Sequence, residues 1–317
     1  MSAVETPTEK WSGTVREVTL GGGTRGRTVT VGGETALPFL GFEGSMPNRP
    51  ALAIEVQDVR PQDWSPALQE AWGEAMNDPA VWAATAAEKG ADLIALTMRS
   101  CHPDLGDQSC AGAAETVERV LGAVSVPVIV YGPGVAERDN DVLVAVAEKT
   151  KGEQLALGLA EEKNYRTIVA AALGNGHSVV ARTPIDVNLA KQLNILISDM
   201  GLPLERVLMD PNTGALGYGL EYTYSVMERL RLAALMGDAM TQQPMICTAG
   251  EEAWRQKEGR VDEGVPEAWG RLAERGVAWE VTTALGLLEA GADILVLRHP
   301  DSLRHVGAAI DDCMKGA

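Results

Sequence analysis

The sequence predicts a single-domain (β/α)8 barrel preceded by a β-hairpin. From residue 51 onward, eight short apolar runs alternate with segments of helical periodicity, as expected for successive βα units. The runs are rich in Val, Ile, Leu and Ala, which is typical of parallel strands buried on both faces. No linker-like tract interrupts this alternation, so we assign residues 51–317 to the barrel and residues 1–50 to an N-terminal extension packed on it.

The N-terminal extension contains two segments of alternating polar and apolar residues, 14–20 and 27–33. They flank a turn with three consecutive glycines at residues 21–23. Two alternating segments joined by a glycine-rich turn are typical of an antiparallel hairpin. We therefore predict a hairpin ahead of the first barrel strand.

The eight apolar runs are the predicted barrel strands. They occupy residues 51–57, 91–98, 126–132, 154–160, 178–183, 206–210, 244–250 and 292–298. The segments between them have helical periodicity; residues 139–149, for example, place Val142, Leu143, Val146 and Ala147 on one face and charges on the other. A doubly wound open sheet is the alternative. The even spacing and the lack of a strong Gly-x-Gly-x-x-Gly after the first run favour a closed barrel.

Composition and charge argue against several classes of partner. The formal net charge is −17 and the isoelectric point is near 4.7, so a nucleic acid or an anionic membrane would be repelled. The N-terminus lacks a basic region followed by an apolar run, and no apolar stretch approaches the ~20 residues that span a bilayer. We expect a cytoplasmic protein with neither a nucleic-acid nor a membrane partner.

The residue types that perform catalysis or bind metals are not grouped in the sequence. No lysine ends a predicted strand, which argues against Schiff-base aldolase chemistry. No Ser or Cys has the neighbouring His and acid that would mark a nucleophile, and the four histidines show no His-x-His spacing. We therefore assign no catalytic residue and no metal ligand.

Candidate binding residues follow the predicted strands, because the carboxyl ends of barrel strands surround the working pocket. The runs that end near residues 183, 210, 250 and 298 are followed by the most polar and glycine-rich segments. We predict a cofactor-binding set of Thr183, Asp186, Asn188, Asp210, Asn212, Thr213, Gly214, Gly217, Tyr218, Gly219, Thr248 and Arg298.

Several of these residues have a second interpretation. Gly214, Gly217 and Gly219 would let the main chain approach a flat ligand, or would supply the positive φ of a tight loop. Asp186 has the position of a helix N-cap. Arg298 would bind an anion such as phosphate, or would pair with a carboxylate at the end of a neighbouring strand.

Longer segments resemble a known family. The most specific is Asp-Pro-x-x-Gly-x-Leu-Gly-Tyr-Gly-Leu-Glu-Tyr, which begins at Asp210. Other matching segments are FEGSMPNRPALAIEVQDV, GADLIALTM, AEEKNYRTIVAA, TPIDVNLAKQLNILI, PMICTAGEEAWR and GADILVLRHP. Together they resemble the small subunit of corrinoid iron–sulfur protein, which is also the delta subunit of acetyl-CoA decarbonylase/synthase. The resemblance runs from the N-terminal hairpin to the last helix.

This resemblance implies a heterodimer with a large subunit that carries a [4Fe–4S] cluster and a mobile cobalamin domain. It implies that the complex accepts a methyl group from methyltetrahydrofolate or another methyl-pterin, through a pterin methyltransferase, and delivers it to acetyl-CoA synthase. This is the reductive acetyl-CoA (Wood–Ljungdahl) pathway of carbon fixation in anaerobes. The barrel would face and shield the cobalamin at the subunit interface without being catalytic alone.

Two other functions suit a barrel with these features. One is a free-standing pterin-dependent methyltransferase, which methyl-pterin binding by the isolated chain would support. The other is a sugar-phosphate enzyme, which phosphate bound beside Arg298 would support.

The cysteine spacing generates a prediction about metal content. Cys101, Cys110, Cys247 and Cys313 form no Cys-x-x-Cys pair, so we expect the isolated chain to contain no stoichiometric iron. Iron analysis of the purified chain measures this directly, and about four iron atoms per chain would contradict it.

Overall fold

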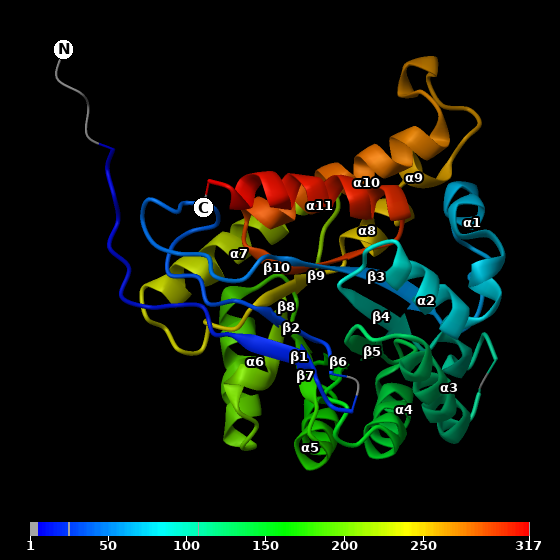
Figure 1. Cartoon of the computed structure of the whole chain (residues 1–317), viewed down its shortest axis with the longest axis horizontal. Coiled ribbons are helices and arrows are strands. Elements are labelled where there is room, and N and C mark those ends of the chain that lie inside the picture. Colours follow the sequence, from blue (N-terminus) through cyan, green and yellow to red (C-terminus); the bar gives the residue numbers. More distant parts are fainter. Residues whose placement is uncertain (1–5, 25, 107, 317) are drawn as a thin grey trace.

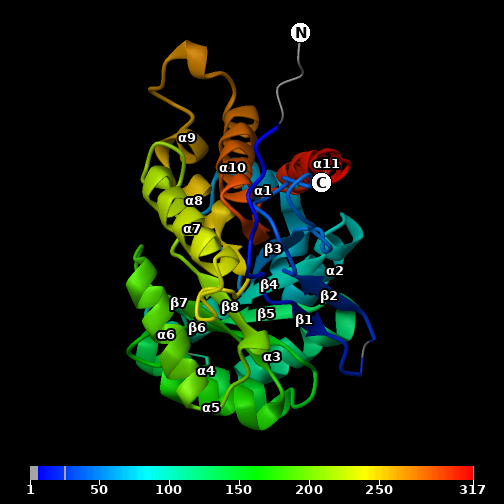
Figure 2. The same ribbon diagram turned by 90° about the vertical axis from the view of Figure 1, so that its left-hand side faces the viewer.

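The computed structural model describes residues 6–24, 26–106 and 108–316, which form a closed barrel surrounded by helices (Figures 1 and 2). Eight parallel strands close the barrel in the order β10-β3-β4-β5-β6-β7-β8-β9. The first and last barrel strands pair with each other, from Ile294 opposite Ala51 to Leu297 opposite Ile54. The predicted (β/α)8 barrel is therefore confirmed, and the open sheet is not formed.

Each barrel strand falls on one of the predicted apolar runs. The strands are β3 (Ala51–Gln57), β4 (Leu93–Thr97), β5 (Val128–Tyr131), β6 (Ala156–Ala160), β7 (Ser178–Arg182), β8 (Val207–Asp210), β9 (Met245–Cys247) and β10 (Ala292–Leu297). The largest difference is at β9, which ends at Cys247 and not at residue 250, because helix α8 begins at Ala249.

Helices cover the outside of the barrel. They are α1 (Pro66–Trp72), α2 (Pro79–Glu88), α3 (Cys110–Ala123), α4 (Ala136–Lys149), α5 (Tyr165–Asn175), α6 (Val187–Asp199), α7 (Leu220–Leu235), α8 (Ala249–Arg255), α9 (Lys257–Arg260), α10 (Leu272–Glu289) and α11 (Pro300–Met314). Short 3₁₀ helices are η1 (Gly73–Asn77), η2 (Arg99–Cys101), η3 (Leu204–Arg206) and η4 (Glu267–Trp269). The segment between α9 and α10, which carries η4, projects from the body of the barrel (orange in Figure 1). The predicted helix 139–149 is α4, and its predicted apolar face is buried.

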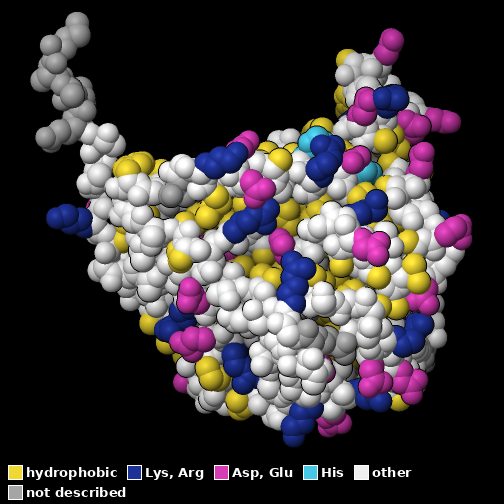
Figure 3. Space-filling model, viewed as in Figure 1, with side chains coloured by type: hydrophobic (Ala, Val, Ile, Leu, Met, Phe, Trp, Pro, Cys, Tyr) yellow, Lys and Arg dark blue, Asp and Glu magenta, His cyan; other side chains and the backbone are white. Residues whose placement is uncertain are grey.

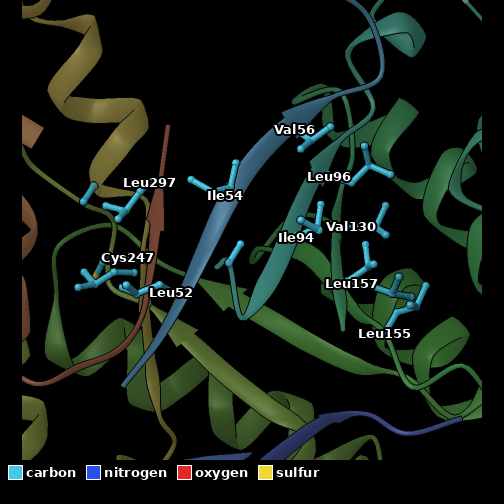
Figure 4. Close-up of a cluster of buried hydrophobic side chains, with 14 of the residues drawn as sticks. Leu52, Ile54, Val56, Ile94, Leu96, Val130, Leu155, Leu157, Cys247 and Leu297 are labelled. Atoms are coloured by element: carbon cyan, nitrogen blue, oxygen red, sulfur yellow. The ribbon is translucent and has the colours of Figure 1, made fainter. Parts of the chain in front are cut away.

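The strands bury alternate residues in two separate cores, because successive side chains of a strand point to opposite faces. One core lies between strands and helices and includes Ile54, Ile94 and Leu157 (Figure 4). The other fills the barrel interior and includes Ala53 and Leu208. Every second residue of each strand therefore faces the inside of the barrel. The inward-facing residues near the strand ends are the ones that reach the mouth of the barrel.

The predicted hairpin forms at the amino end of the barrel. It consists of β1 (Val18–Gly21) and β2 (Thr28–Val31), paired antiparallel. Val18, Leu20 and Val31 belong to the same buried cluster as the inward-facing strand residues. The Gly21 amide donates to the carbonyl of Gln154, just ahead of β6, at 3.1 Å. The hairpin thus packs against the amino-end opening, and the carboxyl ends of the strands form the other mouth.

A buried ionic cluster ties the N-terminal extension to the barrel base. The Arg231 guanidinium lies 2.7 Å from the Asp293 carboxylate and 3.3 Å from that of Glu34, and all three side chains are buried. Asp293 also accepts the Met245 amide at 2.6 Å. Burial, with the Asp293 charge beside it, raises the pKa of Glu34 to about 8.

No helix of the described residues combines the length and the apolar character needed to cross a membrane. On the face seen in Figure 3, basic and acidic side chains are interspersed and do not form a field of one sign.

The raised pKa of Glu34 predicts a pH dependence of stability. Between the ordinary pKa of about 4.5 and the folded value of about 8, the folded chain holds a proton that the unfolded chain releases. The free energy of unfolding therefore falls by up to about 1.4 kcal/mol per pH unit as the pH rises through this window. Glu34→Gln removes this contribution, so the variant gains stability relative to the wild type from about pH 5.5 to about pH 7.5. Urea unfolding at several pH values measures the difference.

The exposed Glu205 supplies the control, because its ion pair with Arg16 lies at the surface. The free energy of unfolding of Glu205→Gln is expected to change with pH in the same way as that of the wild type across this range. A parallel profile for Glu34→Gln as well would show that Glu34 titrates normally in the folded chain.

Candidate functional site

Alternate side chains of each strand point into the barrel, and near the carboxyl ends several of these inward-pointing side chains are polar. In β3, Glu55 has the same parity as the inward-facing Ala51 and Ala53. Tyr131 at the end of β5 is itself part of the interior cluster. Arg298 directly follows β10 and continues the alternation of its inward-facing residues, Ile294 and Val296. The interior is therefore apolar at the hairpin end and polar at the mouth.

These side chains line a cavity of about 380 Å³, which we call the barrel-mouth cavity. Its polar lining consists of Glu55, Gln57, Asp63, Trp64, Thr97, Arg99, Tyr131, Arg182, Thr248, Glu251, Arg255 and Arg298. A second cavity of about 310 Å³, the α6 groove, is lined by Glu161, Glu162, Lys163, Arg182, Thr183, Pro184, Leu189, Gln192, Leu193, Leu196 and Asn212. Arg182 lines both.

A buried ion pair occupies one wall of the barrel-mouth cavity. Arg298 donates to both Glu55 carboxylate oxygens, from Nε at 2.6 Å and from Nη2 at 3.0 Å. Gln57 donates to the same carboxylate at 2.9 Å, and the guanidinium lies over the Trp64 ring at 4.4 Å from its centroid. Of the two interpretations of Arg298, the structure has the pairing with a carboxylate of the neighbouring strand, although Glu55 lies within β3 and not after it, so the guanidinium is not a free anion site.

A second buried carboxylate holds the turn that carries Arg298. Glu280 of α10 accepts the Arg298 amide at 2.5 Å and the His299 amide at 3.2 Å. The first turn of α8 approaches this point so closely that a Cβ at Gly250 would lie 2.6 Å from the Arg298 nitrogen. These main-chain contacts fix the end of β10 independently of the Glu55 ion pair.

A polar cluster links the two cavities. Arg182 donates to the side-chain oxygen of Asn212 at 2.7 Å, and its Nε lies 4.0 Å from the carboxylates of Asp210 and Glu161. The Asp210 carboxylate accepts the Asn212 amide at 2.8 Å. Burial raises the pKa of Asp210 to about 6 although the Arg182 charge lowers it. Asp210 is therefore mostly ionised beside Arg182 at pH 7 and gains a proton as the pH falls towards 6.

The loop after β8 is bonded largely to itself. Thr213 accepts the Thr248 amide at 2.9 Å, which joins this loop to the end of β9. The Gly214 amide donates to the Thr223 hydroxyl at 2.9 Å. A Cβ at Gly214 would lie 2.6 Å from the main chain of Gly219, so Gly214 is required by the loop's own close packing.

The other two glycines of this loop have positive φ. Gly217 has φ +74° and Gly219 has φ +100°, a region that glycine adopts without strain. A Cβ at Gly217 would have only Trp279 near it, at 3.8 Å, so the surface there is open. Tyr218 between them is 47% exposed, and its hydroxyl donates to Glu258 of α9 at 3.0 Å.

The predicted residues after β7 divide between two roles. The Asp186 carboxylate accepts the amides of Asn188 and Leu189 at 2.7 and 2.9 Å, which makes it the N-cap of α6. Asn188 is exposed on the first turn of α6. Thr183 is buried and lines the α6 groove.

Among the residues that the structure describes, no three His, Cys, Asp or Glu side chains gather as a metal-binding group would.

Comparison with known proteins identifies the family. Residues 17–307 match the family model described as CO dehydrogenase/acetyl-CoA synthase delta subunit. The chain belongs to this family. The resemblance stated from the sequence segments is thereby confirmed.

Relatives in this delta-subunit family are similar over nearly the whole chain. Subunit delta 1 of the acetyl-CoA decarbonylase/synthase complex of Methanosarcina thermophila is 40% identical over 306 residues, which is 93% of this chain and 69% of that protein. The delta subunit from Archaeoglobus fulgidus is 39% identical, covering 92% of this chain and 67% of that protein.

Solved structures show the relationship of the fold. Dihydropteroate synthase from Coxiella burnetii in complex with pteroic acid has a TM-score of 0.58 and 11% identity, covering 95% of this chain and 98% of that one. Dihydropteroate synthase from Xanthomonas albilineans with 4-aminobenzoic acid has a TM-score of 0.55 and 16% identity, covering 87% and 96%. At such identities the similarity establishes the barrel fold alone.

In this delta-subunit chain, the predicted residues are distributed over the two cavities, the loop after β8 and the start of α6. Thr248 and Arg298 line the barrel-mouth cavity, and Thr183 and Asn212 line the α6 groove. Neither cavity is lined by Asp186, Asn188, Asp210, Thr213, Gly214, Gly217, Tyr218 or Gly219.

The predicted set omitted Glu55 and Tyr131 because both lie inside strands, and it omitted Arg182 and Glu251 although they border the predicted segments. Glu55 is a charged residue inside an otherwise apolar strand, and it lies an even number of positions from those that face the barrel interior. This pattern would have identified it.

The Glu55–Arg298 pair generates a stability prediction. Arg298→Met leaves the Glu55 carboxylate buried without its cation, so we expect the free energy of unfolding to fall by about 3–5 kcal/mol. The double variant Glu55→Gln/Arg298→Met removes both charges and is expected to regain most of that loss. Urea unfolding of the wild type, the two single variants and the double variant measures the coupling. Additive single effects would show that the pair contributes no coupling energy.

Proposed function

We propose that this chain is the cofactor-facing subunit of a corrinoid methyl carrier. Its carboxyl-end face covers the cobalamin held by a large subunit, which also carries a [4Fe–4S] cluster. The methyl group comes from methyltetrahydrofolate or a related methyl-pterin through its methyltransferase, and passes to acetyl-CoA synthase. Membership of the delta-subunit family, whose relatives are named as subunits of acetyl-CoA decarbonylase/synthase complexes, supports this assignment.

The observation that carries the proposal is an exposed aromatic and aliphatic rim beside the polar cavities. Tyr218 is 47% exposed, Tyr222 65% and Leu189 40%. Tyr218 and Tyr222 lie on the loop and the first helical turn that follow β8, and Leu189 lies on the first turn of α6, where it lines the α6 groove. An apolar rim bordered by polar pockets suits a flat macrocycle that has amide groups at its edge.

When bound, a corrinoid supplies a cobalt centre that accepts and gives up methyl groups. The residues of this chain exclude water from that centre, and the polar side chains at the strand ends donate to or accept from its peripheral amides. The rim made by Tyr218, Tyr222 and Leu189 provides the apolar contact. In this account, the chain binds and shields, and acts on no substrate by itself.

Three of the four histidines have main-chain partners in the structure. The Nδ1 atoms of His102, His177 and His299 each accept a main-chain amide, at 3.2, 3.2 and 3.0 Å. His177 is buried at the base of the barrel wall, and His299 also stacks on the Trp254 ring. These three rings have structural partners and are not poised as general bases at the mouth.

The free-standing pterin-dependent methyltransferase stays the alternative. Binding of a methyl-pterin by the isolated chain, with methyl transfer to free cobalamin, would favour it over the shielding role.

A substitution at Gly217 tests where the corrinoid docks. Asparagine tolerates positive φ better than other side chains do, and a β-branched residue at φ +74° would be strained, so Gly217→Asn is the suitable variant. The added side chain occupies open space at the carboxyl-end face, where only Trp279 lies within 4 Å of the new Cβ. We expect it to weaken association with the corrinoid-loaded large subunit about tenfold or more, as overpacking of a close contact does. Calorimetry measures the affinity.

Gly201→Asn is the matched control. Gly201 also has positive φ, has no atom near its missing Cβ, and follows α6 at the amino-end side of the barrel. It is expected to bind the large subunit like the wild type. Equal weakening with corrinoid-loaded and corrinoid-free large subunit would show that Gly217 meets protein and not the macrocycle. Unchanged binding by a folded Gly217→Asn variant would contradict the placement.

A further inference from the structure

The barrel-mouth cavity contains a buried hydroxyl that no residue of the described structure satisfies. Tyr131 is only 9% exposed, and its hydroxyl has no hydrogen-bond partner there. Its ring passes beside Gly158 of β6, where a Cβ would lie 3.0 Å from the ring. Glycine at this position thus makes room for the tyrosine. Buried polar atoms are nearly always paired, so we expect a ligand or water in the cavity to accept from this hydroxyl.

The hydroxyl is a donor under all ordinary conditions. Burial raises the pKa of Tyr131 well above its usual value, and the charge of Asp210 acts in the same direction while Arg182 opposes it. A neutral phenol can donate to a ligand oxygen. Tyr131, Arg182 and Glu251 all line this cavity. The charges of Arg182 and Glu251 both affect the pKa of the Tyr131 phenol.

The charges that line the cavity are of both signs and nearly balance, which favours an uncharged ligand group over an ionic one. Four arginines and three carboxylates line it, namely Arg99, Arg182, Arg255, Arg298, Glu55, Asp63 and Glu251. Glu55 is neutralised by Arg298, and Arg182 already lies among the carboxylates of Asp210 and Glu161. A carboxylate entering here would face Glu251, and an ammonium would face the arginines. An uncharged group that both accepts and donates suits such a lining.

We propose that the barrel-mouth cavity binds an uncharged amide, whose carbonyl oxygen accepts from the Tyr131 hydroxyl and from Arg182 and whose N–H donates to Glu251. An amide of this kind occurs in the peripheral side chains of a corrin and in the lactam ring of a pterin. The first source rests on the proposed function, and the second does not. Tyr131, Arg182 and Glu251 are all absent from the sequence-predicted binding set.

Propionamide and propionate test the chemistry, because they have the same shape and differ in charge. Ligand-observed NMR titration of the full chain is expected to show saturable propionamide binding and at least about tenfold weaker propionate binding. Tyr131→Phe removes one oxygen and is expected to weaken propionamide binding about two- to tenfold, as loss of one hydrogen bond does. Equal binding of the two probes, or no saturable binding, would overturn the proposal.

Tyr224→Phe is the matched control, because Tyr224 lies on the outer helix α7 and not in the cavity. It is expected to bind propionamide like the wild type. Tyr131→Phe is expected to keep the wild-type urea midpoint or raise it, because its hydroxyl has no partner in the free chain. Unchanged propionamide affinity in Tyr131→Phe would overturn the role of the hydroxyl.

Competition identifies the source of the amide. Displacement of propionamide by dicyanocobinamide assigns the cavity to a corrin side chain, and displacement by pterin assigns it to a lactam ring. If neither displaces it, the amide site stands and its connection to the proposed function fails. If propionamide does not bind while the corrinoid-loaded large subunit does, this inference fails and the proposed function stands.

Discussion

Glu55 and Arg298 face each other across the seam between β3 and β10, where the first and last strands of the barrel meet. The pair places two opposite charges inside the mouth and holds them with Gln57 on one side and Trp64 on the other. Because the carboxylate and guanidinium are both nearly buried, neither charge can be left alone without a large cost. The charge balance of the cavity and the position of the Arg298 side chain in the mouth therefore depend on one contact, while strand pairing and Glu280 hold the main chain of the seam.

The two ends of the barrel differ because the interior side chains differ. At the amino end they are small or aliphatic, and the hairpin packs Val18, Leu20 and Val31 against them. The buried cluster of Glu34, Arg231 and Asp293 secures the chain that follows the hairpin. At the carboxyl end the interior positions carry ionised groups, so that end remains open to a ligand or a partner. The two ends therefore differ chemically because of the inward-facing residues of the strands, and not only because of the loops.

The fold could be predicted from the sequence because the strands are continuous apolar runs separated by amphipathic helices, as at β3 and α4. The site could be predicted only in part. Residues after strands were expected at the mouth, and of the predicted set Thr248 and Arg298 line its cavity. Glu55 and Tyr131 lie within strands, where their inward direction depends on register and closure.

The loop after β8 illustrates what sequence patterns leave undecided. Gly214 is required by the main chain of Gly219, five residues later, and Asp186 caps its own helix. A glycine that approaches a ligand and one that approaches its own loop have the same sequence signature. Only the tertiary structure distinguishes them, because the nearest atom comes from a turn whose path the sequence does not specify.

We propose that the carboxyl-end face of this barrel meets the corrinoid. A structure of the chain bound to its corrinoid-carrying large subunit tests it most directly. We expect the macrocycle over the loops that follow β7 to β10, with its edge beside the exposed Tyr222 side chain and the Gly217 surface. A macrocycle seated on the hairpin end, or on the outer helices away from the mouth, would contradict it.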